Sequence, residues 1–162
     1  MNFLEYIHPE TNPPKDAIAL VIPIIPSEQP KVMVAKRLSG YRPRRGELTF
    51  PGGGIKYGET PEEAAVREGE EETGIVFPKS GLIPAQHNPS IERWGGGFHY
   101  VYMYYAFAEA DRFQKREKKL GKWSAITVEQ LEQYVRDLQI LPFVLNGWWR
   151  ERLTVDEHDK MQ

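Results

Sequence analysis

Cysteine is absent from this sequence of 162 residues. Its absence excludes disulfide bonds, thiolate metal sites and cysteine nucleophiles, and it is compatible with a reducing compartment. Long apolar runs are also missing, because residues 17–25 form the longest one near the N-terminus and Pro23 interrupts it. The first residues include Glu5 and lack a basic segment leading into an apolar one, so no signal peptide is expected. We therefore expect a soluble, cytoplasmic protein that does not bind membranes.

A strong charge of one sign is missing as well. The formal net charge is -2, so the chain has no global positive field to attract nucleic acid, and we expect no binding to duplex nucleic acid. Apolar residues make up 40% and charged residues 27%, which is ordinary for a globular protein. Without a repeat or a linker to divide the chain, residues 1–162 are interpreted as one domain.

The pattern of apolar residues predicts an α/β fold. Residues 98–108, FHYVYMYYAFA, are apolar on both faces of a strand, so both faces of the sheet should be covered. We therefore expect a sheet with helices on each side. Strands are predicted at 17–25 and 31–37, joined as a hairpin by the turn 26–30, with shorter ones at 48–50 and 81–87, and helices at 127–139 and 141–153.

A helix rich in glutamate follows three consecutive glycines in FPGGGIKYGETPEEAAVREGEEETGI, residues 50–75. Thr60 is a good N-cap, Pro61 suits the first helical position, and Glu63 completes a capping box. Gly74 marks the expected end of the helix.

Three carboxylates are predicted to converge on one side of this helix. With Glu68 as the reference and roughly 100° per residue, Glu72 lies at about +40°, Glu71 at about -60° and Arg67 at about -100°. Glu70 points roughly the opposite way and serves as an internal control. Ala65, Gly69 and Thr73 form a narrow stripe of small residues that would let the helix lie close to a sheet.

An acidic helix face is usually no more than a solvated surface. Two features favour a metal site here: few bulky apolar residues dock the helix, and a glycine-rich turn precedes it whose backbone can approach a ligand. Clustered carboxylate oxygens suit Mg²⁺ or Mn²⁺, and such cations would offset the repulsion between the carboxylates.

The stretch resembles the Nudix box, G-x5-E-x7-R-E-U-x-E-E-x-G-U, in which U is apolar. The one departure is Gly69, where the family has an apolar residue, and we interpret it as a variation in packing. The matching residues are Gly53, Glu59, Arg67, Glu68, Glu71, Glu72, Gly74 and Ile75.

The resemblance implies a Nudix-type α/β/α sandwich with a mixed sheet and a metal-dependent hydrolase that cleaves a pyrophosphate linkage in a nucleoside diphosphate linked to another group. By position, it makes Glu68, Glu71 and Glu72 ligands of Mg²⁺ or Mn²⁺, with the carbonyl of Gly52 as a further ligand. Arg67 would orient the carboxylates, and Glu59 would join the same charged network. A glutamate would accept the proton of the attacking water.

Residues outside the box supply further candidates. Glu117 lies in a segment similar to the loop that commonly contributes a catalytic glutamate, although a solvent-exposed surface residue fits it equally well. The upstream segment is partly similar to the motif of coenzyme A-cleaving members, so Arg37, Arg42 and Arg45 are candidates for binding phosphate, unless the loop RPRRGE is simply solvated. Trp94, beside three glycines, is the candidate for stacking on a base.

Three hypotheses remain from the sequence. The first is a Nudix enzyme acting on a small nucleotide-type substrate: a nucleotide, a nucleotide sugar, ADP-ribose, coenzyme A or a nucleoside triphosphate. The second is a regulatory Nudix-like domain that binds a nucleotide without cleaving it, although such domains usually lose glutamates that this box retains. The third is an acidic helix without metal. Trp148 and Trp149 fit either core packing or a homodimer contact.

Overall fold

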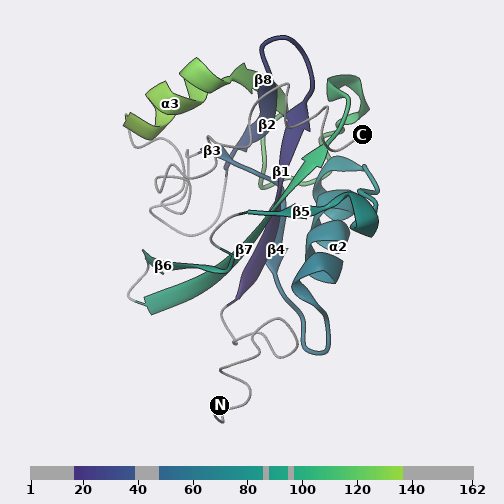
Figure 1. Ribbon diagram of the computed structural model, residues 1–162, viewed down its shortest axis with the longest axis vertical. Coiled ribbons are helices and arrows are strands. Elements are labelled where there is room, and N and C mark those ends of the chain that lie inside the picture. Colours follow the sequence, from purple (N-terminus) through teal and green to yellow (C-terminus); the bar gives the residue numbers. More distant parts are fainter. Residues whose placement is uncertain (1–16, 39–47, 86–87, 95–96, 137–162) are drawn as a thin grey trace.

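A computed structural model describes residues 17–38, 48–85, 88–94 and 97–136, and Figure 1 shows their arrangement. The elements in chain order are β1 (Ile18–Ile25), β2 (Lys31–Lys36), β3 (Leu48–Thr49), β4 (Gly52–Gly54), α2 (Pro61–Thr73), the 3₁₀ helix η1 (Lys79–Gly81), β5 (Ile83–Pro84), β6 (Ser90–Trp94), β7 (Gly97–Phe107), the 3₁₀ helix η2 (Ala110–Arg112), β8 (Ser124–Thr127) and α3 (Val128–Arg136).

The described strands form one mixed sheet. Its main path runs β3-β2-β1-β7-β5, while β4 pairs with β1, β6 with β7 and β8 with β2. β1 and β2 form the expected antiparallel hairpin, and β1 runs parallel to the long strand β7, from Ile18 beside Val101 to Ile24 beside Phe107. The pairing of β1 with β4 places Gly52, Gly53 and Gly54 at the centre of the sheet, next to the strand that α2 covers.

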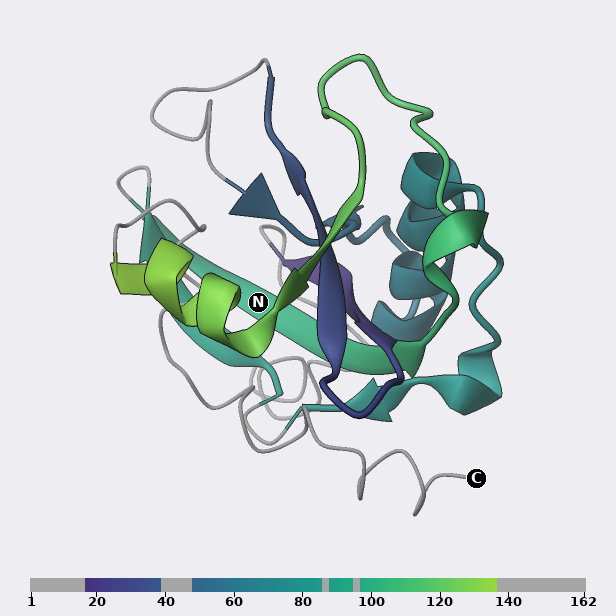
Figure 2. The ribbon, with the colours of Figure 1, turned by 90° about the horizontal axis from the view of Figure 1, so that it is seen from above.

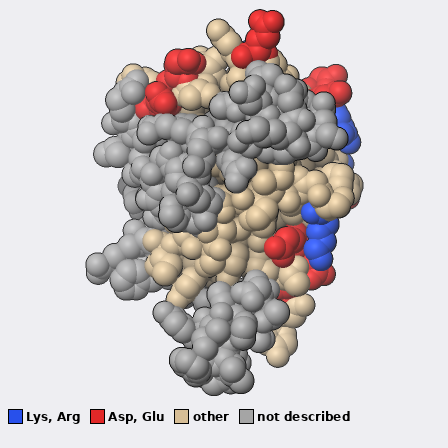
Figure 3. Space-filling view, in the orientation of Figure 1, with Lys and Arg blue, Asp and Glu red and all other residues tan. Residues whose placement is uncertain are grey.

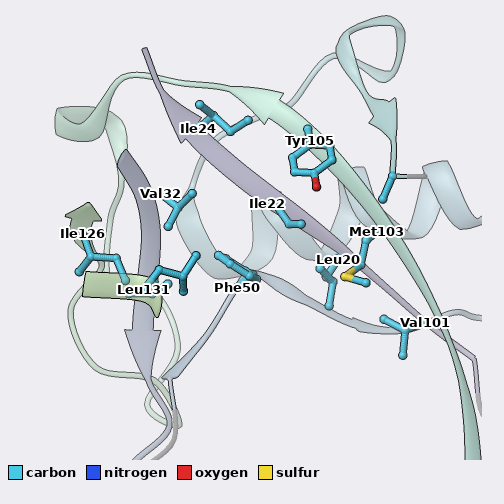
Figure 4. Packing of buried hydrophobic residues seen from close by; sticks show 12 residues of the cluster. Leu20, Ile22, Ile24, Val32, Phe50, Val101, Met103, Tyr105, Ile126 and Leu131 are labelled. Atoms are coloured by element: carbon cyan, nitrogen blue, oxygen red, sulfur yellow. The ribbon is translucent and has the colours of Figure 1, made fainter. Parts of the chain in front are cut away.

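Apolar residues on both faces of the central strands create two cores. Along β1, Leu20 and Ile22 belong to one cluster with Phe50 and Leu131 of α3 (Figure 4), whereas Val21 lies in a second cluster beneath α2. The helices therefore cover opposite faces of the sheet, as Figure 2 shows in a view turned by 90°. The α/β/α arrangement expected from a strand apolar on both faces is confirmed.

The start and end of α2 follow the sequence prediction. The Thr60 hydroxyl accepts a hydrogen bond from the backbone N–H of Glu63 at 3.1 Å, and the Glu63 carboxylate accepts one from the N–H of Thr60 at 3.0 Å. Pro61 occupies the first turn, and the helix ends at Gly74, whose φ of 82° is left-handed. These local signals determine where the charged side of the helix begins and ends.

The small-residue stripe of α2 lies against the sheet, because Ala65, Gly69 and Thr73 are all buried. A Cβ atom at Gly69 would stand only 2.9 Å from the ring of Phe77 and 3.8 Å from Val21 of β1. Phe77, which follows the helix and is 1% exposed, therefore fills the space beside position 69. This contact gives a physical reason for glycine at a position where the Nudix box has an apolar residue.

Several sequence predictions fall outside the described residues. They concern the helix at 141–153 with Trp148 and Trp149, most of the basic loop 38–47 and the end of the strand expected at 81–87; of the predicted helix 127–139, the structure describes α3. Within the described part of the chain, no helix is both long and apolar enough to cross a membrane.

Candidate functional site

Arg67 makes most of the hydrogen bonds on the charged side of α2. Its Nε and NH2 atoms donate to the two carboxylate oxygens of Glu59 at 2.7 and 2.9 Å, a bidentate pair. NH1 donates to Glu68 at 2.8 Å and reaches Glu71 at 3.5 Å, and NH2 also donates to the carbonyl of Gly54 at 2.9 Å. One guanidinium thus joins the glycine turn, the loop before the helix and two carboxylates of the helix itself.

Glu59 is held as a carboxylate by this network. Its hydrogen bonds with Arg67 lower its pKa below the ordinary value, against the effect of partial burial, and the backbone N–H of Lys56 adds a further hydrogen bond at 2.9 Å. The pKa of Arg67 is raised by the same contact with Glu59. The pair is therefore ionised throughout the physiological range.

Gly53 lies directly against the carboxylate of Glu68. A Cβ atom at this position would stand 2.6 to 2.7 Å from the carboxylate atoms of Glu68, closer than any real side chain approaches. A side chain at position 53 would therefore displace the carboxylate of Glu68 from its place over β4. This close approach couples the first glycine of the box to the position of the Glu68 carboxylate.

Glu72 is the buried carboxylate of the site, with 3% of its side chain exposed. Oε1 accepts a hydrogen bond from the backbone N–H of Gly52 at 2.6 Å, and Oε2 lies 3.6 Å from Nζ of Lys119. Burial raises the pKa of Glu72 to about 7, against the opposing effects of the Gly52 hydrogen bond and the positive charge of Lys119. A carboxyl group that titrates near neutral pH in a cluster of charges is typical of a functional site.

The segment from Phe113 to Trp123 packs over the last turn of α2. The indole Nε1 of Trp123 donates to the backbone carbonyl of Glu72 at 3.0 Å, and the N–H of Gln114 donates to the carbonyl of Thr73 at 2.9 Å. These two bonds bring Lys119 to the site. Sequence reasoning missed Lys119, because its distance from the box along the chain offers no periodic signal that links the two.

Of the candidates outside the box that the structure describes, Arg37 is the one whose charge acts on a glutamate of the box. Its positive charge acts on Glu72, and its backbone forms a bridge with Leu120. Glu117 lies in the same segment as Lys119, and its backbone carbonyl accepts a hydrogen bond from Lys115, but the structure gives its carboxylate no contact with the box. For Trp94 the structure describes the backbone, paired with Gly97, and Arg42 and Arg45 lie outside the described residues.

The donor set fits a hard divalent cation. Glu68, Glu71 and Glu72 provide only carboxylate oxygens, the ligands that Mg²⁺ and Mn²⁺ prefer. In the part of the chain that the structure describes, no three acidic or histidine side chains already stand together as a metal-binding group. Instead, Arg67 binds Glu68 and Glu71 while Glu72 turns to Gly52 and Lys119. Figure 3 shows acidic and basic groups side by side along the edge where α2 lies in Figure 1.

Comparison with protein families gives one match over most of the chain. The model described as the NUDIX domain matches residues 14–144, which include every element from β1 to α3. The resemblance seen in the box therefore extends to the whole fold. No comparison tests the partial similarity of the upstream segment to coenzyme A-cleaving members, which stays a prediction.

Two curated relatives and one solved structure are similar to the chain. It is 40% identical over 90 residues to the 8-oxo-dGTP diphosphatase of Escherichia coli, covering 49% of this chain and 69% of that protein. It is 32% identical over 90 residues to the ADP-ribose pyrophosphatase of Methanocaldococcus jannaschii, covering 56% of this chain and only 47% of that protein. The NUDIX domain of Shewanella oneidensis NrtR, solved with ADP ribose, superposes with a TM-score of 0.67 at 21% identity, over 95% of this chain and 100% of that one.

Proposed function

The chain belongs to the Nudix family, and on that basis we propose that it is a pyrophosphohydrolase whose active site is the charged side of α2. The observation that carries the proposal is the arrangement around Arg67, which brings the carboxylates of Glu59, Glu68 and Glu71 and the carbonyl of Gly54 to one guanidinium. A surface helix without a function has no need for such a network above a buried carboxylate, Glu72.

We assign Glu68, Glu71 and Glu72 as the ligands of a divalent cation, Mg²⁺ or Mn²⁺, with the carbonyl of Gly52 beside them. A bound cation would supply Lewis acidity to a phosphoryl oxygen and activate water for attack on phosphorus. Glu71, with 48% of its side chain exposed, and Glu68 would exchange part of their contact with Arg67 for the cation. Arg67 remains anchored by Glu59 and keeps the carboxylates in position.

The proton of the attacking water needs an acceptor, and two carboxylates are candidates for it. Glu72 is buried in the charged cluster, but as a ligand of the cation its carboxylate would be held ionised by the metal and would have less freedom to accept a proton. Glu117 is the alternative from outside the box. The two are alternatives: Glu72 lies in the charged cluster but is also assigned to the cation, whereas Glu117 lies outside the ligand set and its contacts in the structure involve its backbone.

For the substrate we propose a small molecule with a nucleotide-type pyrophosphate. The two curated relatives are named for activities on 8-oxo-dGTP and on ADP-ribose, so an oxidised nucleoside triphosphate and a nucleoside diphosphate sugar are the first compounds to test. A regulatory domain that binds a nucleotide without hydrolysis is the second candidate. The complete set of box glutamates favours the enzyme.

The experiment that tests this function measures phosphate or nucleotide release from a panel of compounds with Mg²⁺, Mn²⁺ or chelator. The panel holds 8-oxo-dGTP, canonical nucleoside triphosphates, ADP-ribose, nucleotide sugars, dinucleoside polyphosphates and coenzyme A. We expect one class to be hydrolysed only with metal, and Glu71→Gln to lower kcat by about 10³-fold through the loss of a metal ligand.

Glu70→Gln is the matched control, because Glu70 makes the same change of charge on the same helix but is exposed on its other side. It should retain the activity of the unmodified protein. If the folded protein binds Mn²⁺ and nucleotide yet hydrolyses nothing in the panel, the proposal of an enzyme gives way to the regulatory domain.

A further inference from the structure

We propose that Lys119 is a substrate-binding residue, whose ammonium group, together with the guanidinium of Arg37, binds phosphate oxygens of the substrate beside Glu72. This inference rests on the proposed function and adds to it a residue outside the Nudix box. It is carried by the position and the loose pairing of Lys119 and by the positive charge of both side chains.

The position of Lys119 is fixed by the end of β2. The N–H of Leu38 donates to the carbonyl of Lys119 at 2.7 Å, and the N–H of Gly121 donates to the carbonyl of Lys36 at 2.8 Å. Arg37 and Leu120 form an antiparallel bridge between these two bonds. The backbones that carry Arg37 and Lys119 are thus paired, and this pairing holds Lys119 where its ammonium group reaches the carboxylate of Glu72.

Neither cation makes full use of its donors. Nζ of Lys119 is 3.6 Å from Oε2 of Glu72, too far for a hydrogen bond, and 43% of the lysine side chain is exposed, so a solute can reach it. Nε of Arg37 is buried without a hydrogen-bond partner among the described residues. The exposed, incompletely paired ammonium of Lys119 can therefore accept a further anionic partner, such as a phosphate oxygen.

The charges of the site point to the same ligand. Four carboxylates, from Glu59, Glu68, Glu71 and Glu72, face three cationic side chains, from Arg67, Arg37 and Lys119. A divalent cation on the carboxylates would reverse the sign of this cluster. Lys119 and Arg37 would then lose Glu72 as their counter-charge, and the oxygens of a diphosphate would replace it.

The test uses the full chain and two probes, Mn²⁺ alone and then imidodiphosphate, a diphosphate that is not hydrolysed. Binding of each is measured by calorimetry for the unmodified protein, Lys119→Met and Lys119→Arg. The matched control is Lys118→Met, which removes the same charge from the neighbouring exposed residue. Thermal unfolding of each variant verifies that it is folded.

Two opposite effects are expected for Lys119→Met. Mn²⁺ should bind about fivefold more tightly, because a cation that competes for Glu72 is gone. Imidodiphosphate should bind the Mn²⁺-loaded protein about 10- to 100-fold more weakly, because a charge-assisted hydrogen bond is lost. Lys119→Arg should recover most of the imidodiphosphate affinity, and Lys118→Met should match the unmodified protein.

If Lys119 has a purely structural role, Lys119→Met should bind both Mn²⁺ and imidodiphosphate more weakly or should unfold at a lower temperature. Either result overturns the inference. Equal binding of imidodiphosphate by Lys119→Met and Lys118→Met would overturn it as well. Failure of the unmodified protein to bind Mn²⁺ at all is a different outcome, which overturns the proposed metal-dependent function and this inference with it.

Discussion

The sheet-facing side of α2 and its charged side belong to one helix but are stabilised in different ways. On the sheet side, Ala65, Gly69 and Thr73 are buried with almost no side-chain volume of their own, and Phe77 supplies the bulk. On the charged side, Arg67 distributes its hydrogen bonds over several carboxylates, and burial of Glu72 works against its ionisation. Packing determines where the helix lies. The charged side instead lowers the stability of the folded protein when no ligand is bound, because it holds partly buried charges.

The largest loss of stability is expected from a change on the sheet-facing side of α2. Phe77→Ala removes a ring that is 1% exposed and leaves a cavity between α2 and the sheet, so the free energy of unfolding should fall by about 3–5 kcal/mol. Urea denaturation measures it. Val76→Ala is the control, because Val76 is 58% exposed, and it should change stability by less than about 0.5 kcal/mol. Equal losses for the two variants would contradict the packing role of Phe77.

The next effect concerns the charged side and depends on pH. Burial raises the pKa of Glu72 from 4.5 to about 7, so the folded protein binds a proton that the unfolded chain releases. The contribution of Glu72 to the free energy of unfolding should therefore be most favourable below pH 4.5. It should fall by about 3 kcal/mol as the pH rises to 7.

Urea denaturation in chelator across this pH range measures the change. Glu72→Gln has no proton to exchange and should lack this contribution, so it should be the more stable protein at pH 8. A parallel pH dependence for the unmodified protein and the variant would show that another group is responsible.

The smallest effect expected is that of Gly69→Leu. A side chain at this position meets the ring of Phe77, so the variant should be destabilised by about 1–3 kcal/mol in spite of the better helix propensity of leucine. The double variant Gly69→Leu with Phe77→Ala should lose less free energy of unfolding than the two single variants lose together, because leucine then fills the cavity. If Gly69→Leu kept its stability but changed Mn²⁺ affinity strongly, the position would belong to the charged side instead.

Local signals made much of the fold predictable. The boundaries of α2 depend on Thr60, Glu63 and Gly74, which act within a few residues, and the two apolar faces of β7 depend on alternation along one strand. The shared side of Glu68 and Glu71, both in contact with Arg67, could be predicted too, because residues on one helix have a fixed angular spacing, whereas the turn of Glu72 towards Gly52 and Lys119 could not. The interpretation of Gly69 as a packing position agrees with its contact with Phe77.

Contacts between distant segments were not predictable in the same way. Lys119 reaches Glu72 only because Trp123 and Gln114 attach their segment to the end of α2, and no pattern along the chain indicates that attachment. The role of the backbone N–H of Gly52 has no signal in the sequence either. The resemblance implies a carbonyl ligand at that residue, and the structure adds an N–H donor that holds Glu72 in place.

The hydrogen bond from the indole of Trp123 to the carbonyl of Glu72 has a spectroscopic consequence. Indole emission responds to the hydrogen bonding and charges around its ring, and this ring is 5% exposed and attached to the residue at the centre of the site. A chain in which Trp94, Trp148 and Trp149 are replaced by phenylalanine would carry Trp123 as its single tryptophan. Its emission would report on the occupancy of the glutamates without any added label.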